Sequence, residues 1–259
     1  MKSAADIIRN PPFFIAGPCV IESLSTLLTQ AAGLLGIFAA LDLQDHFIFK
    51  ASADKANRTS GSSYRGPGWR KGLDFLHEVH DLVGVPVITD VHEPYQPMEA
   101  LQAVDMLQIP AMLSRQTDLI QMAGATGLPV LFKKGQTMKP MDARHMINKV
   151  SPEYPGPFAV CERGSAFGYG TVVDFSNFQV LRDLLPNSPI VFDCTHPAPS
   201  RDFAPAMAYA AMATGMVDGI FMEVHPDPDK AYCDGEKMIS TGDLAPILKQ
   251  LKKLWEVSR

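Results

Sequence analysis

Short apolar segments recur along the whole chain, and their number and spacing constrain the fold more than any other feature of the sequence. Each segment has three or four residues, ends in polar residues and is followed by a longer stretch of mixed character. Eight such segments occur, at Phe13–Ala16, Phe47–Phe49, Val85–Ile88, Met106–Ile109, Val130–Phe132, Phe158–Val160, Ile190–Phe192 and Gly219–Met222. Short, continuously apolar strands are typical of a parallel sheet whose faces are covered by helices.

The stretches between these predicted strands carry apolar residues at three- and four-residue spacing, as a helix with one buried face requires. The pattern is plainest at residues 23–41, 68–84 and 203–216. Eight strand–helix units in a chain of 259 residues predict an α/β protein with one domain, a (β/α)8 TIM barrel over residues 1–259. Residues 1–10 are expected to form an extension that covers the bottom of the barrel, and the last helix is expected over residues 244–257.

A doubly wound open sheet would also alternate strands with helices. That fold places a glycine-rich loop, G-x-G-x-x-G, after its first strand. Here the corresponding stretch reads AGPCVIES, residues 16–23, and lacks this spacing. The barrel is therefore favoured, and the carboxyl ends of barrel strands form the active face.

The overall composition argues against some classes of partner and location. A net charge of −5 and an isoelectric point of about 5.8 argue against a nucleic-acid binder that works by bulk positive charge. No apolar run reaches the roughly 18 residues of a membrane helix, and the first residues lack the apolar core of a signal peptide. A cytoplasmic protein is expected. The four cysteines form no C-x-x-C pair and are expected to be reduced thiols.

A basic cluster follows the second predicted strand, in the stretch FIFKASADKANRTSG, residues 47–61. In a barrel, cations at or beyond several strand ends would converge on one mouth: Lys50, Lys55, Arg58, Arg115, Lys133 and Arg163. Like charges at close range repel each other unless an anion is bound. Two phosphates, or a phosphate and a carboxylate, are therefore the predicted ligands.

A second set of strand-end residues combines a thiol, an imidazole and two carboxylates. Its members are Cys19, His196, Glu223 and Asp234. Such a mixed set suits a divalent transition ion such as Zn, Fe, Mn or Co. Their spacing in the sequence is no metal signature by itself, so they form a site only if the barrel brings them together.

Motifs that cover about residues 12–240 resemble one family, the 3-deoxy-D-manno-octulosonate 8-phosphate synthases, also named 2-dehydro-3-deoxyphosphooctonate aldolases. The motifs are FKASADKANRTS, SYRGPG, VITDVHE, IPAMLSRQTDLI, KKGQTM, CERGSAFGYG and FDCTH. The K-A-N-R-[ST]-S loop is the most specific, since the related 3-deoxy-heptulosonate 7-phosphate synthases carry a K-P-R-type loop. The resemblance implies a transferase that condenses phosphoenolpyruvate with D-arabinose 5-phosphate, a step toward the Kdo sugar of lipopolysaccharide. It also implies a homotetramer and no organic cofactor.

The resemblance also implies a role for each matching residue. The phosphoenolpyruvate pocket would contain Lys50, Ser52, Lys55, Lys133, Gln136 and Arg163. The loop for the arabinose phosphate would contain Asn57, Arg58 and Thr59, joined by Arg115 from a neighbouring subunit. The metal ligands of the metal-dependent class would be Cys19, His196, Glu223 and Asp234, because an Asn replaces the Cys in the metal-independent class. Asp90 and His92 are candidates for moving protons near the reacting carbons, by their position only.

Two departures from the family pattern keep alternatives open. The segment after His196 is only PAPSRD, where the family has a longer, glycine-rich loop, so a related synthase with a different sugar is an alternative. The sequence CDG at residues 233–235 is more familiar from the metal-independent class. A catalytically silent barrel and a lyase with a Schiff-base lysine are further alternatives, and the retained cations and metal-type residues argue against the first of these.

Overall fold

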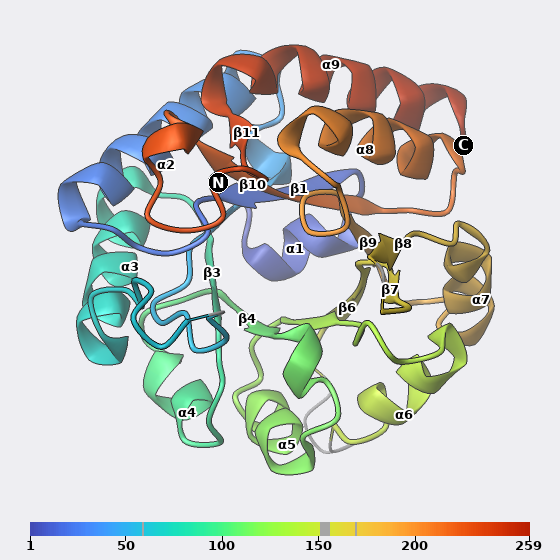
Figure 1. The fold of residues 1–259 in the computed structure, drawn as a ribbon, viewed down its shortest axis with the longest axis horizontal. Coiled ribbons are helices and arrows are strands. Elements are labelled where there is room, and N and C mark those ends of the chain that lie inside the picture. The colour runs from blue at the N-terminus through green and yellow to red at the C-terminus, as the bar shows by residue number, and fades with distance from the viewer. Residues whose placement is uncertain (59, 151–155, 169) are drawn as a thin grey trace.

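The computed structural model describes residues 1–58, 60–150, 156–168 and 170–259. Within this part, eight parallel strands close into a barrel that helices surround (Figure 1). The strands are β1 (Phe13–Gly17), β2 (Phe47–Lys50), β3 (Val87–Asp90), β4 (Met106–Ile109), β5 (Val130–Lys133), β6 (Phe158–Glu162), β9 (Ile190–Asp193) and β10 (Gly219–His225). Pairing of β10 with β1, from Phe13–Gly219 to Gly17–Glu223, closes the sheet. The predicted (β/α)8 barrel is confirmed.

Helices form the outer layer in the order that the sequence predicts. They are α2 (Leu24–Ala39), α3 (Trp69–Val83), α4 (Gln96–Ala100), α5 (Thr117–Ala125), α6 (Ala143–Ile147), α7 (Ser176–Leu184), α8 (Ala204–Ala213) and α9 (Thr241–Val257). Short 3-10 turns are η1 (Gln44–His46), η2 (Ala111–Leu113), η3 (Pro140–Asp142), η4 (Arg201–Phe203) and η5 (Pro228–Lys230). Helix α9 begins earlier than predicted because the Ser240 hydroxyl accepts a hydrogen bond from the backbone N–H of Gly242 and caps it.

Three strands lie outside the predicted set. Strands β7 (Ser165–Ala166) and β8 (Thr171–Val172) form an antiparallel hairpin, and β11 (Ile239–Ser240) pairs with the end of β10. Each has two residues, which is too short for an alternation of apolar and polar residues to be recognised.

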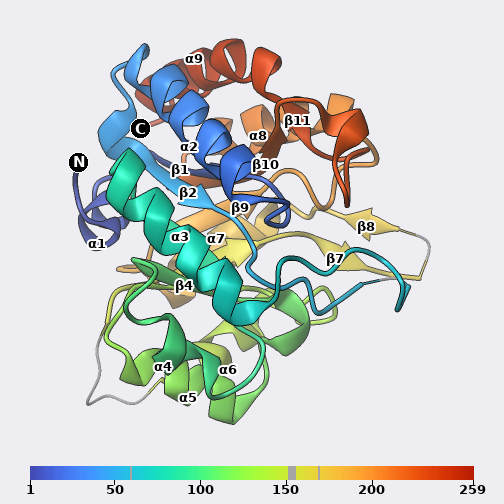
Figure 2. The ribbon, with the colours of Figure 1, turned by 90° about the vertical axis from the view of Figure 1, so that its left-hand side faces the viewer.

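The first helix closes one end of the barrel. Helix α1 (Ala4–Arg9) buries Ile7 and Ile8 completely in a cluster with interior side chains such as Leu131 and Phe221. The β7–β8 hairpin lies at the opposite end (Figure 2). Residues 1–10 therefore do cover the bottom of the barrel.

Strand alternation decides which side chains enter the barrel. In β1, Phe13 and Ile15 lie in the interior cluster, whereas Phe14 and Ala16 pack in the cluster shared with the helices. The residue two positions after an interior apolar residue faces the same way. At the carboxyl ends of the strands, this alternation turns polar side chains into the barrel. They are Lys50, Asp90, Gln108, Lys133, Asp193 and Glu223.

Among the described helices, none has both the length and the apolar content that crossing a membrane requires.

We expect Ile8→Ala to lower the free energy of unfolding by about 2–5 kcal/mol, because it leaves a cavity in the plug at the bottom of the barrel. The measurement is chemical denaturation followed by circular dichroism. The exposed neighbour Arg9 provides the control, since Arg9→Ala removes no buried side chain. Equal stability of the two variants would show that α1 does not stabilise the barrel.

Candidate active site

A cavity of about 410 Å³ opens at the carboxyl ends of the strands. Its wall contains most of the site residues predicted from the sequence: Cys19, Lys50, Ser52, Lys55, Asn57, Arg58, Asp90, Lys133, Gln136, Arg163, His196, Glu223 and Asp234. Segments from both ends of the chain therefore meet at one mouth. Thr59, the third residue of the predicted sugar-phosphate loop, lies outside the described residues.

Two candidate site residues in the described part of the chain, His92 and Arg115, do not line this cavity. The ring nitrogens of His92 are buried and have no hydrogen-bond partner among the described residues, while its backbone N–H donates to Gln96 Oε1 at 2.6 Å. Arg115 is exposed, between η2 and α5. A role for Arg115 therefore depends on a neighbouring subunit, as the family resemblance implies, and the role of His92 stays a prediction.

Lys50 is held at the end of β2 by a buried ion pair. Its Nζ lies 3.2 Å from Glu223 Oε1 and donates to the carbonyl of Cys19 at 2.8 Å, with both charged side chains nearly inaccessible. Burial would lower the pKa of Lys50, but the negative charges of Glu223 and Asp90 outweigh it and raise the pKa. Lys50 is therefore a permanent cation in the cavity wall.

Lys133 and Lys134 are neighbours in the sequence, but they lie on opposite sides of the barrel wall. Lys133 donates to Asp193, and its ammonium lies 3.2 Å from the centroid of the Phe221 ring. Lys134 is fully buried outside the barrel interior, where its Nζ lies 3.4 Å from Glu162 Oε1. Only Lys133 belongs to the cavity.

Two arginines in the wall retain unpaired donors. Arg58 and Arg163 each have a buried Nε with no hydrogen-bond partner among the described residues. A buried guanidinium donor without an acceptor is costly, and a carboxylate or phosphate in the cavity would satisfy it. The unpaired donors therefore indicate an anionic ligand.

The loop after β2 is fixed by its own ion pair. The carboxylate of Asp54 accepts two hydrogen bonds from the Arg65 guanidinium, at 2.6 and 2.8 Å. The backbone N–H of Lys55 donates to the carbonyl of Arg65 at 2.8 Å. This bidentate pair joins the two ends of the loop that carries Lys55, Asn57 and Arg58 into the cavity.

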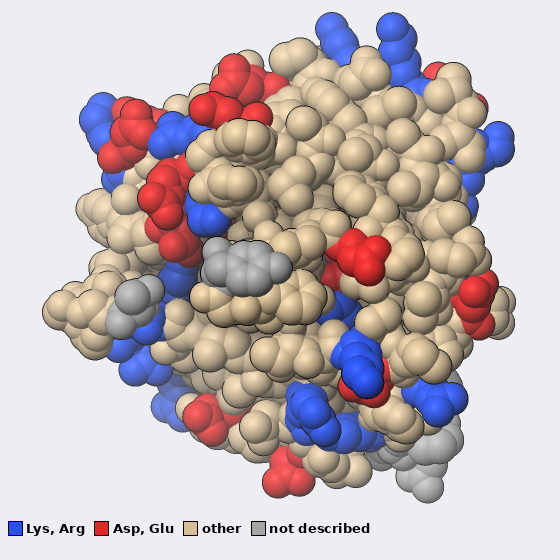
Figure 3. All heavy atoms as spheres, turned by 45° about the vertical axis from the view of Figure 1, so that its right-hand side comes forward, with Lys and Arg blue, Asp and Glu red and all other residues tan. Residues whose placement is uncertain are grey.

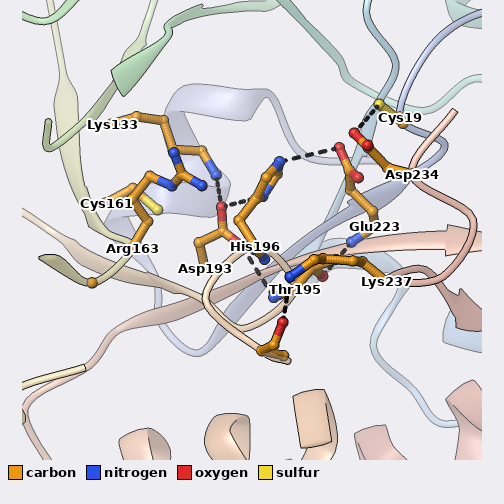
Figure 4. A network of polar contacts seen from close by, with 12 residues as sticks. Cys19, Lys133, Cys161, Arg163, Asp193, Thr195, His196, Glu223, Asp234 and Lys237 are labelled. Carbon is orange, nitrogen blue, oxygen red and sulfur yellow. Dashed lines mark hydrogen bonds and ion pairs between the residues drawn. The ribbon is translucent and has the colours of Figure 1, made fainter. Parts of the chain in front are cut away.

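His196 lies between two buried carboxylates at the ends of β9 and β10 (Figure 4). Its Nδ1 lies 2.7 Å from Asp193 Oδ2, and its Nε2 lies 3.8 Å from Glu223 Oε1. Burial would raise the pKa of Asp193, but the charges of His196 and Lys133 lower it well below its usual value. An ionised Asp193 accepts a hydrogen bond from Nδ1–H, and when the ring is neutral this tautomer presents the Nε2 lone pair to the cavity, which is the arrangement typical of a metal-binding histidine.

A compact group of thiols and a carboxylate lies on the other side of Glu223. One ligand atom each from Cys19, Cys233 and Asp234 lies within 4.8 Å of the others. Lys55 donates to Cys19 Sγ at 2.7 Å and also pairs with Asp234. Glu223 Oε2 is buried in the same cavity and has no hydrogen-bond partner within the part of the chain that the structure describes. Sulfur and carboxylate donors of this kind fit a divalent transition ion.

The sequence analysis did not propose several residues of the wall as site residues, among them Gln108, Asp193, Phe221 and Cys233. The first three follow the alternation of their strands and were detectable from that pattern. Gln108 donates to Asp90 Oδ1 at 2.7 Å and so orients a nominated residue. Cys233 had no such signal, because it lies in the loop between β10 and β11, where no periodicity applies.

The cations of the site lie inside the cavity. Lys50 and Lys133 are only 2% and 3% exposed. On the face drawn in Figure 3, basic and acidic groups are interspersed around a broad uncharged area. The site is thus built for a small anionic ligand that enters the barrel mouth, not for a polyanion that lies on the surface.

Comparison with known proteins agrees with this architecture. The profile of the DAHP synthetase I family matches residues 7–258. A 2-dehydro-3-deoxyphosphooctonate aldolase of Desulfatibacillum aliphaticivorans is 47% identical over 253 residues, which cover 93% of this chain and 91% of that protein. Aldolases of the same name from Legionella pneumophila (strain Corby) and Xylella fastidiosa (strain M12) are 43% and 44% identical, over 96% and 97% of this chain and 94% of each relative. The chain therefore belongs to the DAHP synthetase I family, alongside these 2-dehydro-3-deoxyphosphooctonate aldolases.

Proposed function

We propose that this chain condenses phosphoenolpyruvate with D-arabinose 5-phosphate and water to give 3-deoxy-D-manno-octulosonate 8-phosphate and phosphate. The relatives' shared name supports this assignment. The observation that carries it is the set of cavity cations. Arg58 and Arg163 each keep a buried donor that has no partner among the residues described, and Lys50 and Lys133 lie in the same wall.

The reaction joins two anions, and the cavity offsets their repulsion. Phosphoenolpyruvate attacks the aldehyde carbon of the sugar through its C3, water adds at C2, and the resulting hemiketal phosphate expels phosphate. Lys133 and Arg163 supply positive charge for the phosphate of phosphoenolpyruvate, and Lys50 and Lys55 for its carboxylate. Holding both substrates in register is worth roughly 7–11 kcal/mol of the barrier in favourable cases.

The sugar phosphate is assigned to the loop after β2. Asn57 and Arg58 line the same cavity, and the Asp54–Arg65 pair holds their loop. Asp90, which Gln108 orients, lines the cavity and is the candidate to take or return a proton during addition of water.

The metal assignment rests on the chemistry of the donors. Cys19, His196, Glu223 and Asp234 would hold a divalent ion, since all four line the cavity and Glu223 Oε2 has no partner among the described residues. When bound, such an ion would polarise the aldehyde oxygen or lower the pKa of a bound water. Asp193 keeps the His196 ring oriented for this role.

We further propose a cytoplasmic homotetramer. Arg115 is exposed and lies outside the cavity of its own chain, which supports a contribution to a neighbour's sugar-phosphate site. All four cysteines are free thiols, which agrees with a reducing compartment.

A lyase that uses a Schiff-base lysine is disfavoured. Such a lysine needs a lowered pKa so that its amine is neutral. Despite burial, the pKa of Lys50 is raised by Glu223, and that of Lys55 is raised by Cys19 and Glu223. Both side chains therefore act as cations.

The test is phosphate release from phosphoenolpyruvate by chelator-treated protein, with and without added Mn²⁺ or Zn²⁺. We expect release that requires arabinose 5-phosphate and that the metal restores. Release without metal would retain the synthase assignment and remove the metal role of Cys19. No release with arabinose 5-phosphate, erythrose 4-phosphate or ribose 5-phosphate would refute the synthase assignment.

A further inference from the structure

We infer that Cys233 is a second sulfur ligand of the metal centre, which therefore takes a thiophilic ion such as Zn²⁺ through Cys19, Cys233 and Asp234. This inference rests on the proposed metal role of the site. It goes beyond the four ligands that the family resemblance implies, because that set contains only one thiol.

The three ligand atoms form the most compact donor group of the cavity. The two sulfurs and a carboxylate oxygen lie within 4.8 Å of one another, and Cys19 Sγ lies 3.4 Å from Asp234 Oδ2. Small adjustments of side-chain rotamers would bring all three atoms to one ion.

The backbone holds Cys233 and Asp234 at this place. Asp234 has a φ of 51°, in the left-handed region that non-glycine residues rarely occupy. A Cβ on the following residue, Gly235, would lie 2.0 Å from the carbonyl oxygen of Pro228, so the turn passes too close to η5 for any larger side chain. Strained backbone of this kind is frequent at ligand-binding sites.

Positive charge is already favoured at this group. The Lys55 ammonium contacts Cys19 Sγ and pairs with Asp234. Glu223 is 2% exposed, and its Oε2, in the same cavity, has no partner in the described ranges of the chain. The carboxylates at this group therefore provide the negative charge that attracts a cation. Lys55 competes with the metal ion for the ligand atoms of Cys19 and Asp234.

The donor types decide which ion is preferred. Thiolates select soft ions such as Zn²⁺, whereas Mn²⁺ prefers oxygen donors. A centre with two sulfurs should therefore discriminate in favour of Zn²⁺ more strongly than a centre with one. The other two cysteines do not contribute, because Cys161 and Cys194 are fully buried and burial raises the pKa of Cys161 to about 12.

The test uses cobalt as a spectroscopic probe of chelator-treated full-length protein. Co²⁺ bound by thiolates gives sulfur-to-metal charge-transfer absorption in the near ultraviolet. We expect Cys233→Ser and Cys19→Ser each to remove about half of this absorption. Cys194→Ala, which removes a thiol that faces the helical layer, is the matched control and should leave it unchanged.

Competition by Zn²⁺ and Mn²⁺ against bound Co²⁺ gives the second readout. Cys233→Ser should weaken Zn²⁺ binding by at least about tenfold, the lower end of the loss seen when an outer-sphere partner is removed, and affect Mn²⁺ binding less. Circular dichroism of each variant checks that it is folded.

The possible failures are distinguishable. Unchanged absorption and unchanged Zn²⁺ affinity in Cys233→Ser, with absorption lost in Cys19→Ser, would overturn the inference and keep the metal role of Cys19. A folded wild-type protein that binds no Co²⁺ would overturn both the inference and the metal part of the proposed function. Neither result would touch the synthase assignment, which phosphate release tests separately.

Discussion

Lys133→Met should slow phosphate release from phosphoenolpyruvate by about 10²–10³-fold, the loss typical of removing one preorganised charge from an active site. The ammonium of Lys133 lies against Asp193 and over the Phe221 ring, where little water screens it. Methionine has a similar length and no charge, so it preserves packing while it removes the electrostatic contribution. Steady-state measurement of phosphate release with saturating arabinose 5-phosphate gives the turnover number.

The adjacent lysine provides a matched control for this variant. Lys134 is also buried, but it pairs with Glu162 on the outer side of the barrel wall. Lys134→Met should therefore lower stability and leave the turnover of the folded fraction within a few-fold of the parent. If both variants lost turnover equally while folded, the assignment of Lys133 as the only cavity lysine of this pair would be wrong.

Lys50→Met should lower the free energy of unfolding by about 3–5 kcal/mol, as is typical when one partner of a buried ion pair is removed. Glu223 would then keep its charge inside the barrel without its ion pair to Lys50, and Oε2 has no partner among the described residues even in the parent protein. The measurement is urea denaturation of chelator-treated protein, which keeps metal binding out of the comparison.

The double variant Lys50→Met/Glu223→Met tests whether the loss of stability in Lys50→Met arises from the unpaired charge of Glu223. Because it removes both buried charges, it should recover most of the lost stability, although it cannot retain activity. The pair Arg70–Glu99, whose nitrogen and oxygen lie 3.3 Å apart at the surface, is the control. Arg70→Ala should cost less than about 1 kcal/mol. If the double variant were no more stable than Lys50→Met, the unpaired charge of Glu223 would not be the cause of the lost stability.

The other contacts of Asp193 explain the result that we expect for Lys133→Met. Asp193 has several partners, since it accepts hydrogen bonds from Lys133, the His196 ring and the backbone N–H of Thr195. It therefore stays satisfied when Lys133 is replaced. This is why Lys133→Met is expected to affect turnover more than folding.

Local patterns in the sequence determined the architecture of this protein. Each of the eight apolar runs overlaps a strand, although β3 begins at Val87 and not at Val85, and alternation within the strands turns Lys50, Lys133 and Glu223 inward. These features depend on contacts within one element, where a period of two residues on a strand decides which face is buried. The family motifs added the candidate residues, and most of them line one cavity.

The tertiary structure alone decided which distant groups meet and which stay apart. It brings Cys233 to Cys19 and leaves Arg115 exposed outside the cavity. It also leaves Glu223 Oε2 without a hydrogen-bond partner among the described residues, whereas the sequence placed Glu223 only at the end of a predicted strand. The physical reason is that these relations depend on barrel closure and on the loop between β10 and β11. Barrel closure and the conformation of this loop produce no periodic pattern in the sequence, because residues that are close in space can be far apart in the chain.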